Sequence, residues 1–141
     1  MNPTLMHFIG LIHRWLYVFT NGFLGSQFGT LKFLLLTTTG SQTGRLRTLP
    51  LLYLEDGDNL LLPASAGGNS RHPAWVRNIE VDPNVTVRIG SKLILMEGSL
   101  AEEPARTHFY KKFIEVMSHY ADYEKRSGRV IPVIVLSKRE A

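Results

Sequence analysis

The chain has 141 residues, of which 44% are hydrophobic and 20% charged, a composition typical of one globular domain with a substantial core. It contains no cysteine, which excludes disulfides, thiolate metal sites and cysteine nucleophiles. The formal charge of +4 and the pI near 9.6 favour anionic partners such as a phosphorylated cofactor, a membrane surface or a nucleic acid. Because no RNA-binding signature and no basic run accompanies this charge, we expect no nucleic-acid partner.

Apolar residues recur at helical spacing between Leu5 and Phe19, which predicts an amphipathic helix. A membrane span needs about 20 mostly apolar residues, and Arg14 near the middle of this stretch argues against one. Two interpretations remain: the helix packs on the rest of the domain, which we favour, or it lies on a membrane surface. We therefore expect an N-terminal amphipathic helix and loop over residues 1–30 and the main domain over residues 31–141.

The segment from Leu31 to Tyr53 is expected to form two β-strands joined by a polar, basic turn. Leucine and β-branched threonine dominate Leu31 to Thr39, as in a half-buried strand. Gly40 to Gly44 contains two glycines, which allow positive φ angles and a close approach of a ligand to the backbone. Arg45 and Arg47 are two residues apart, so in an extended strand both guanidinium groups would project from one face towards one phosphate or carboxylate. The alternative is a basic hairpin that simply faces solvent.

The rest of the chain predicts four further short strands and two helices. An Asp-Gly turn precedes the first of these strands, and a stretch of small residues, Ala64 to Asn69, follows it. Six short strands with few helices and no β-α-β alternation indicate an antiparallel barrel, mainly β with flanking helices, rather than a doubly wound sheet. The expected strands are residues 59–63, 85–89, 92–100 and 131–136, and the expected helices run from Pro73 to the Asp82-Pro83-Asn84 turn and from Pro104 to about Met117.

No motif indicates catalysis by the protein's own side chains alone. The five histidines lack metal-ligand spacing, and the G-x-S-x-G, P-loop and G-x-G-x-x-G motifs are missing from the sequence. The chain offers instead a candidate anion site, a wall of small residues and clustered aromatic residues. This combination is typical of an enzyme in which a bound cofactor carries out the chemistry.

An ordered series of short motifs runs from about Phe33 to Val135. In chain order the motifs are Thr37-Thr38-Thr39-Gly40, Gly44-x-x-Arg47, Pro50-Leu51-x-Tyr53, Gly67-Gly68, His72-Pro73-x-Trp75, Asn78, Asp82-Pro83, Tyr120-x-x-Tyr123 and Ile131-Pro132. Together they resemble the deazaflavin (coenzyme F420)-dependent nitroreductase family. The resemblance implies a split β-barrel related to that of flavin-binding oxidases.

The same resemblance implies an oxidoreductase that transfers a hydride from reduced deazaflavin to an electron-poor quinone, enone or nitro compound. The glycine-rich hairpin would hold the phosphate and polyglutamate tail, and the segments around Ser65 and Trp75 would line the tricyclic ring. Ser65, Tyr120 and Tyr123 are the implied catalytic residues, although either tyrosine could instead be an aromatic core residue with a polar tip. The implied cofactor contacts are Gly40, Ser41, Gln42, Gly44, Arg45, Arg47, Pro50, Ala64, Ser65, Ala66, Gly67, Ala74, Trp75 and Asn78, and no metal site is implied.

This chain departs from the family pattern at three positions. Family members often carry lysine at the position of Gln42, some carry another at Ala66, and a third tyrosine or similar residue stands at the position of Met117. A charge-assisted hydrogen bond contributes roughly 1.5–3 kcal/mol, so loss of the two lysines could weaken binding of an anionic tail unless arginines such as Arg71 or Arg129 compensate. Two alternatives therefore stay open: an FMN-dependent reductase, or a membrane-associated barrel that binds a lipid or fatty acid.

We expect the partner to be a small electrophilic acceptor, and the protein to act in the cytoplasm as a monomer or homodimer. Weak peripheral contact with the inner face of the cell membrane, through the N-terminal helix, is the alternative location.

Overall fold

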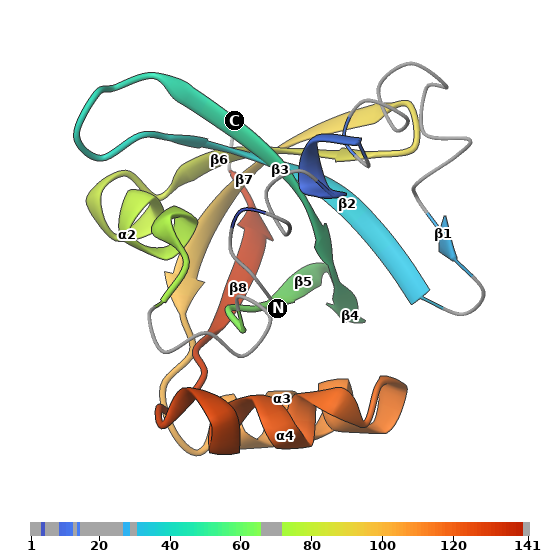
Figure 1. The fold of residues 1–141 in the computed structure, drawn as a ribbon. Helices are drawn as coiled ribbons and strands as arrows, with labels where there is room; N and C mark the ends of the chain where they lie inside the picture. Colours follow the sequence, from blue (N-terminus) through green and yellow to red (C-terminus); the bar gives the residue numbers. More distant parts are fainter. Residues whose placement is uncertain are drawn as a thin grey trace.

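A computed structural model describes Thr4, residues 9–12, Arg14, and residues 27–28, 31–65 and 72–139. Its strands form one antiparallel sheet of eight strands in the order β1-β2-β6-β7-β8-β5-β4, with β3 paired to β2 beside this path. The strands are β1 (Gln27–Phe28), β2 (Leu31–Thr39), β3 (Leu46–Leu52), β4 (Leu54–Asp56), β5 (Asn59–Pro63), β6 (Asn84–Ile89), β7 (Lys92–Leu100) and β8 (Val133–Lys138). The helices named in Figure 1 are α2 (Ala74–Val81), α3 (Ala105–Val116) and α4 (His119–Ser127).

The predicted antiparallel split barrel with flanking helices is confirmed, with differences in detail. The sheet has eight strands rather than six, because the two-residue β1 lies in an expected loop and the three-residue β4 forms one arm of the expected Asp-Gly turn. Strand β8 covers Val133–Lys138 instead of residues 131–136. Residue Pro132, before the strand, accepts a hydrogen bond from Ala64 N (2.9 Å). Helix α4 was not predicted as a separate helix.

The split in the barrel lies where β3 meets β4. Tyr53 alone separates the two strands, and its N–H donates to the carbonyl of Lys32 (3.1 Å). One short stretch of chain thus pairs with β2 through β3 and with β5 through β4. Because strand β3 belongs to this connection, its position is set by both halves of the barrel.

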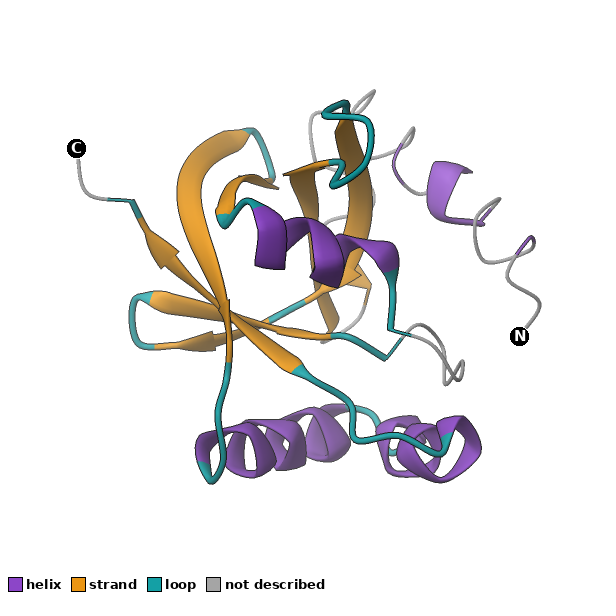
Figure 2. Cartoon of the chain, turned by 90° about the vertical axis from the view of Figure 1, so that its left-hand side faces the viewer, coloured by secondary structure: helices purple, strands orange, loops and turns teal. Residues whose placement is uncertain are grey.

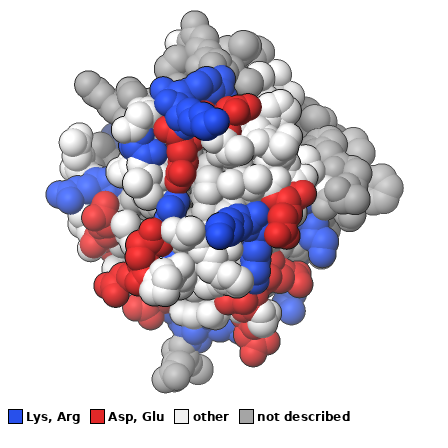
Figure 3. All heavy atoms as spheres, turned by 90° about the horizontal axis from the view of Figure 1, so that it is seen from below, with Lys and Arg blue, Asp and Glu red and all other residues white. Residues whose placement is uncertain are grey.

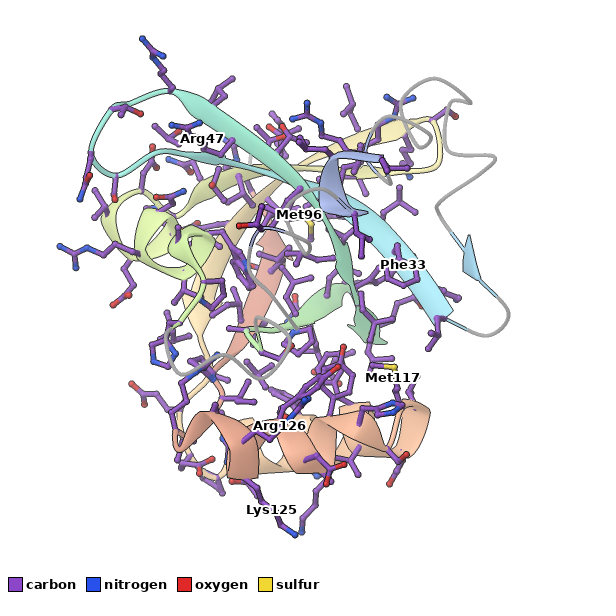
Figure 4. All side chains as sticks on the ribbon, viewed as in Figure 1. Phe33, Arg47, Met96, Met117, Lys125 and Arg126 are labelled. Atoms are coloured by element: carbon purple, nitrogen blue, oxygen red, sulfur yellow. The ribbon has the colours of Figure 1, made fainter. Side chains whose placement is uncertain are left out.

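Alternate residues of the strands pack into two separate apolar clusters. The inner cluster fills the barrel around Leu34, Leu36 and Met96, the last of which Figure 4 labels, and helix α2 adds Trp75 and Ile79 to the cluster. The outer cluster lies between the barrel wall and helices α3 and α4. Its fully or largely buried members are Leu52, Leu61, Tyr110, Phe113, Tyr120, Ile131 and Val133. Figure 2 shows α2 on one side of the sheet and the α3–α4 pair on another.

Close packing of α2 depends on a glycine in β7. A Cβ atom at Gly98 would lie 3.0 Å from Cγ2 of Ile79 and 3.1 Å from Cδ2 of Leu136. The Gly98 N–H also donates to the carbonyl of Pro83 (2.9 Å), just after the helix. Glycine at this position therefore lets the helix approach the strand closely enough to complete the inner cluster.

Residues 9–12 and Arg14 are helical, and this part of the N-terminal segment lies beside β3 (Figure 1). Arg14 Nη1 donates to the carbonyl of Thr48 (3.5 Å), while Ile9 and Ile12 are each 48% exposed. Leu11, also in the predicted amphipathic stripe, is 40% exposed and lines the cavity described below, and the other residues of the stripe fall outside the described part of the chain. Among the helices that the structure describes, none is long and apolar enough to cross a membrane.

Charges of both signs cover the side of the molecule formed by α3 and α4. Figure 3 shows blue basic and red acidic side chains interspersed on this face. Arg106 on α3, for example, pairs with Glu124 on α4 through Nη1 and Oε1 at 2.7 Å. The positive net charge is therefore not gathered into a single basic surface on this side.

Candidate active site

A cavity of about 380 Å³ lies between β3, the end of β5, the beginning of α2 and the beginning of α4. Four of the predicted site residues line it: Pro50, Ser65, Trp75 and Tyr120. Small-molecule sites usually measure about 300–1,000 Å³, so the cavity has room for a flat ring. The structure thus brings together residues that are up to 70 positions apart in the chain, from Pro50 to Tyr120.

The walls of the cavity are mostly apolar. Residues 48–52 of β3 form one wall, and Trp75, which is 4% exposed, forms part of another. Pro73 precedes α2 with a φ of −64°, the angle to which its ring is restricted, and so fixes the direction in which the helix begins. Polar side chains at the cavity are the hydroxyl residues Thr48, Ser65 and Tyr120. Apolar walls with a few hydroxyl groups are suited to an aromatic ring that carries polar substituents.

The glycine-rich turn, Gly40 to Gly44, lies at the end of the β2–β3 hairpin. Gly40 N donates to the carbonyl of Arg45 (2.7 Å), and Gly44 takes a φ of +70° that favours glycine. A Cβ atom on Gly40 would lie 2.9 Å from Thr43 Oγ1 and 3.0 Å from the Arg45 carbonyl oxygen. Both glycines are therefore required by the turn itself.

Asn78 connects this turn to α2. Its Oδ1 accepts the N–H of Ser41 (2.9 Å) and its Nδ2 donates to Oγ1 of Thr38 (3.0 Å). The side chain is buried, with 6% of the residue exposed. Helix α2 consequently runs from the cavity, where Trp75 lies, to the turn. Asn78 was predicted as a cofactor contact, and the structure places it behind the turn.

The two arginines after the turn are both exposed, but the prediction that one strand carries them is wrong for Arg45. Strand β3 begins at Leu46, and Arg45 lies between the turn and the strand, where its N–H donates to Thr43 Oγ1 (3.2 Å). Arg47 lies within the strand, opposite Thr38 of β2, and Figure 4 shows it on the part of the hairpin near α2. A phosphate or carboxylate at the turn could still contact both guanidinium groups.

The other predicted cofactor contacts have varied positions. Gln42 is exposed at the tip of the turn, Ala64 is fully buried, and Ala74 is exposed on α2. Ala74 is not among the residues that line the cavity. Ala66 and Gly67 lie outside the described residues.

Tyr120 reaches the cavity, whereas Tyr123 does not line it. The two residues share one face of α4, and their rings meet edge-on with centroids 5.2 Å apart. Tyr123 also lies under the guanidinium group of Arg126, 5.1 Å from its ring centroid. Burial, followed by the nearby Tyr123 and Tyr110, raises the pKa of Tyr120. Its hydroxyl group therefore stays protonated at neutral pH and can donate a hydrogen bond.

Sequence reasoning missed the position of Arg129. The sequence indicates this residue only as a cation able to replace a lysine, yet its side chain is hydrogen-bonded to the backbone of Ala64 and Ser65 and to the ring of His72. Its partners are 57 to 65 residues away in the chain, so no local pattern could identify them. The sequence feature that comes nearest to indicating these contacts is the His72-Pro73-x-Trp75 motif, because it contains the partner His72.

The residues present fit a deazaflavin. The apolar cavity can take the ring, and the exposed arginines and the backbone of the turn can take an anionic tail. Nothing in the described residues resembles a metal site, since no group of three or more His, Asp or Glu side chains is placed to hold an ion.

Comparisons with known proteins agree with this fit. Residues 11–138 match the sequence pattern of the F420H(2)-dependent quinone reductases. An F420H(2)-dependent quinone reductase of Mycobacterium tuberculosis is 35% identical over 136 residues, which cover 91% of this chain and 89% of that protein.

Two solved structures have the same fold. The F420-H2-dependent reductase FDR-A superposes with a TM-score of 0.68 at 33% identity, over 74% of this chain and 93% of its own. A domain-swapped dimer superposes with a TM-score of 0.72 at 30% identity, over 96% of this chain and all of its own. These findings confirm the expected deazaflavin-dependent reductase rather than a lipid-binding barrel. The chain belongs to the F420H(2)-dependent quinone reductase family.

Proposed function

We propose that this protein reduces a small quinone in the cavity between β3, α2 and α4. The observation that carries the proposal is the meeting of Pro50, Ser65, Trp75 and Tyr120 around one cavity, with a basic turn that is hydrogen-bonded to Asn78 of α2. When bound, reduced F420 supplies the hydride. The residues of this chain would bind and orient the two reactants and keep water from the ring.

The cofactor would lie along α2. Trp75 and the apolar residues of β3 would cover its ring, and the Gly40–Gly44 turn with Arg45 and Arg47 would hold its anionic tail. Support comes from Asn78, whose hydrogen bond to Ser41 fixes the turn relative to the helix that carries Trp75. Ser65 lines the same cavity and offers a hydroxyl group to the ring.

Tyr120 would hold the acceptor. Its protonated hydroxyl group can donate a hydrogen bond to a quinone oxygen, which gains negative charge as the hydride arrives. The raised pKa of Tyr120 makes transfer of its own proton unfavourable, so we assign it a binding role and expect the proton to come from solvent.

Titration of the purified protein with four ligands tests this function. The ligands are F420, a deazaflavin without phosphate and polyglutamate, FMN and a long-chain fatty acid, each followed by fluorescence. We expect F420 to bind most tightly of the four ligands. We also expect the protein loaded with F420H2 to oxidise that cofactor when a quinone is added. Tighter binding of FMN or fatty acid, or no quinone-dependent oxidation, would contradict the proposal.

We further propose that the protein forms homodimers. One solved relative is a domain-swapped dimer, and large apolar side chains remain exposed on the outer sheet surface, at Leu46 (73%), Leu93 (68%) and Leu95 (58%). Covering such side chains is a common role of a subunit interface. Light scattering coupled to gel filtration should give twice the mass of the 15.9 kDa chain; the mass of one chain would contradict this.

A further inference from the structure

Arg129 bonds chain segments that lead to three of the elements around the cavity. Its Nη2 donates to the carbonyl oxygens of Ala64 (2.9 Å) and Ser65 (3.0 Å), and its Nη1 lies 2.7 Å from Nδ1 of His72. Ala64 and Ser65 directly follow β5, His72 precedes α2, and Arg129 itself follows α4. One side chain therefore joins the ends of the three elements that bring Ser65, Trp75 and Tyr120 to the cavity.

The guanidinium group is held in place from its own side as well. Gly128 ends α4 with a φ of +67°, in the left-handed region that favours glycine, and this turns the chain towards β5. The Arg129 N–H then donates to Oγ of Ser127 (3.4 Å). Burial lowers the pKa of Arg129, while Tyr110 and Glu124 oppose that shift. Arginine remains a cation in proteins, so the guanidinium group acts only as a hydrogen-bond donor.

The contact with His72 fixes the state of the imidazole ring. A guanidinium group has no acceptor, so Nδ1 of His72 must be unprotonated to receive the hydrogen bond. Burial and the positive charge of Arg129 lower the pKa of His72, and Glu80 opposes them. The neutral ring thus links α2 to Arg129 without placing two cations in contact.

We propose that Arg129 is a positioning residue of the reductase site, which sets Ser65 and Trp75 at their places beside Tyr120. Its effect on catalysis rests on the proposed function, whereas its contacts belong to the protein itself. The planar guanidinium group reaches three acceptors at once through two nitrogens. A lysine at this position would keep the charge and lose that geometry.

Arg129→Lys keeps the positive charge but loses the planar guanidinium geometry, whereas Arg129→Gln removes the charge. Lys125→Gln serves as the matched control, because it removes one positive charge from the exposed side of α4 and its side chain points away from the barrel (Figure 4). Two readouts need no cofactor: the fluorescence of Trp75 in a Trp15→Phe background, which leaves one tryptophan, and the NMR titration of His72. Affinity for F420 and the kcat and KM for a quinone are then measured for each variant.

We expect both Arg129 variants to shift the emission of Trp75, and Arg129→Gln to raise the pKa of His72. Both should lower kcat/KM at least about tenfold, as expected for loss of charge-assisted hydrogen bonds. The loss should be the same for tailed and untailed deazaflavin, and Lys125→Gln should behave as the parent protein. If the parent protein binds no deazaflavin, the proposed function fails while the two cofactor-free readouts still decide the role of Arg129.

Full retention of Trp75 emission and of kcat/KM by Arg129→Lys would overturn the proposal, because charge alone would then suffice. Unchanged Trp75 emission and an unchanged His72 titration in Arg129→Gln would overturn it too. Should Arg129→Gln fail to fold, His72→Ala removes a single link and should shift Trp75 emission in the same direction by a smaller amount. An unshifted emission in His72→Ala and Arg129→Lys would again contradict the proposal.

Discussion

Replacing Asn78 with leucine tests whether α2 holds the Gly40–Gly44 turn in place. Leucine has a similar size, but it leaves the Ser41 N–H and the Thr38 hydroxyl without their present partner. An unsatisfied buried polar group costs about 1–3 kcal/mol. The Thr38 group is almost fully buried and Ser41 is half-buried, so the two together should lower the free energy of unfolding by about 2–4 kcal/mol.

Urea denaturation of the cofactor-free protein measures this loss, and Thr38→Val supplies the matched control. Valine keeps the shape of threonine and removes the hydroxyl partner of Asn78. Because both changes break the same hydrogen bond, the double variant should lose less stability than the two single losses added together. Binding is the second measurement: a loosened turn should weaken F420 by about tenfold or more and affect untailed deazaflavin much less.

Two outcomes would refute this reasoning. If Asn78→Leu unfolds at the urea concentration of the parent protein, the amide contributes no net stability. If it weakens tailed and untailed deazaflavin equally, the turn does not hold the tail, and Asn78 acts through the packing of α2 instead.

Three further predictions concern single side chains. Arg47→Ala should weaken F420 binding more than about tenfold, and the loss should shrink at high salt; equal affinity of the parent protein for tailed and untailed deazaflavin would contradict this. Tyr120→Phe should slow quinone turnover with F420 affinity unchanged within about threefold, and Tyr123→Phe should have a smaller effect because it does not line the cavity; normal turnover by Tyr120→Phe with several quinones would make that residue structural. Hydrogen bonds from Thr107 lower the pKa of Glu103 from 4.5, so the ionised carboxylate adds stability that is present above pH 4.5 and is lost as the pH falls through the lowered pKa. Thermal unfolding of Thr107→Val between about pH 3 and 6 should show a weaker dependence on pH, and an identical pH profile would refute the assignment.

The strands with clear turn signals were predictable from the sequence to the residue. Strands β2, β5 and β7 have the predicted bounds, because Gly40, the Asp-Gly turn and the Gly90-Ser91 turn mark where they begin or end. Helix α4 was missed because its sequence is mostly polar. Within it only Tyr120 and Ser127 are buried, too few for a visible apolar stripe.

An ordered set of motifs was enough to identify the site from the sequence. The hydrogen bonds that hold the site together could not be predicted from those motifs. Asn78 and Arg129 act through partners 37 to 65 residues distant, and such pairs arise from the way the barrel folds rather than from spacing along the chain. The prediction for Arg45 and Arg47 assumed that the strand began at once after Gly44. Arg45 instead lies just before the strand, and its N–H bonds back to Thr43 Oγ1 in the turn.

The two apolar clusters have a consequence for how such reductases diverge. Trp75, which we propose covers the cofactor ring, belongs to the inner cluster, whereas Tyr120, which we propose holds the acceptor, belongs to the outer one. A substitution on α4 can therefore reshape the acceptor side without disturbing the packing inside the barrel. Selection for new quinones would then act mainly on α3 and α4, while the barrel interior would stay under the constraint of close packing around Trp75.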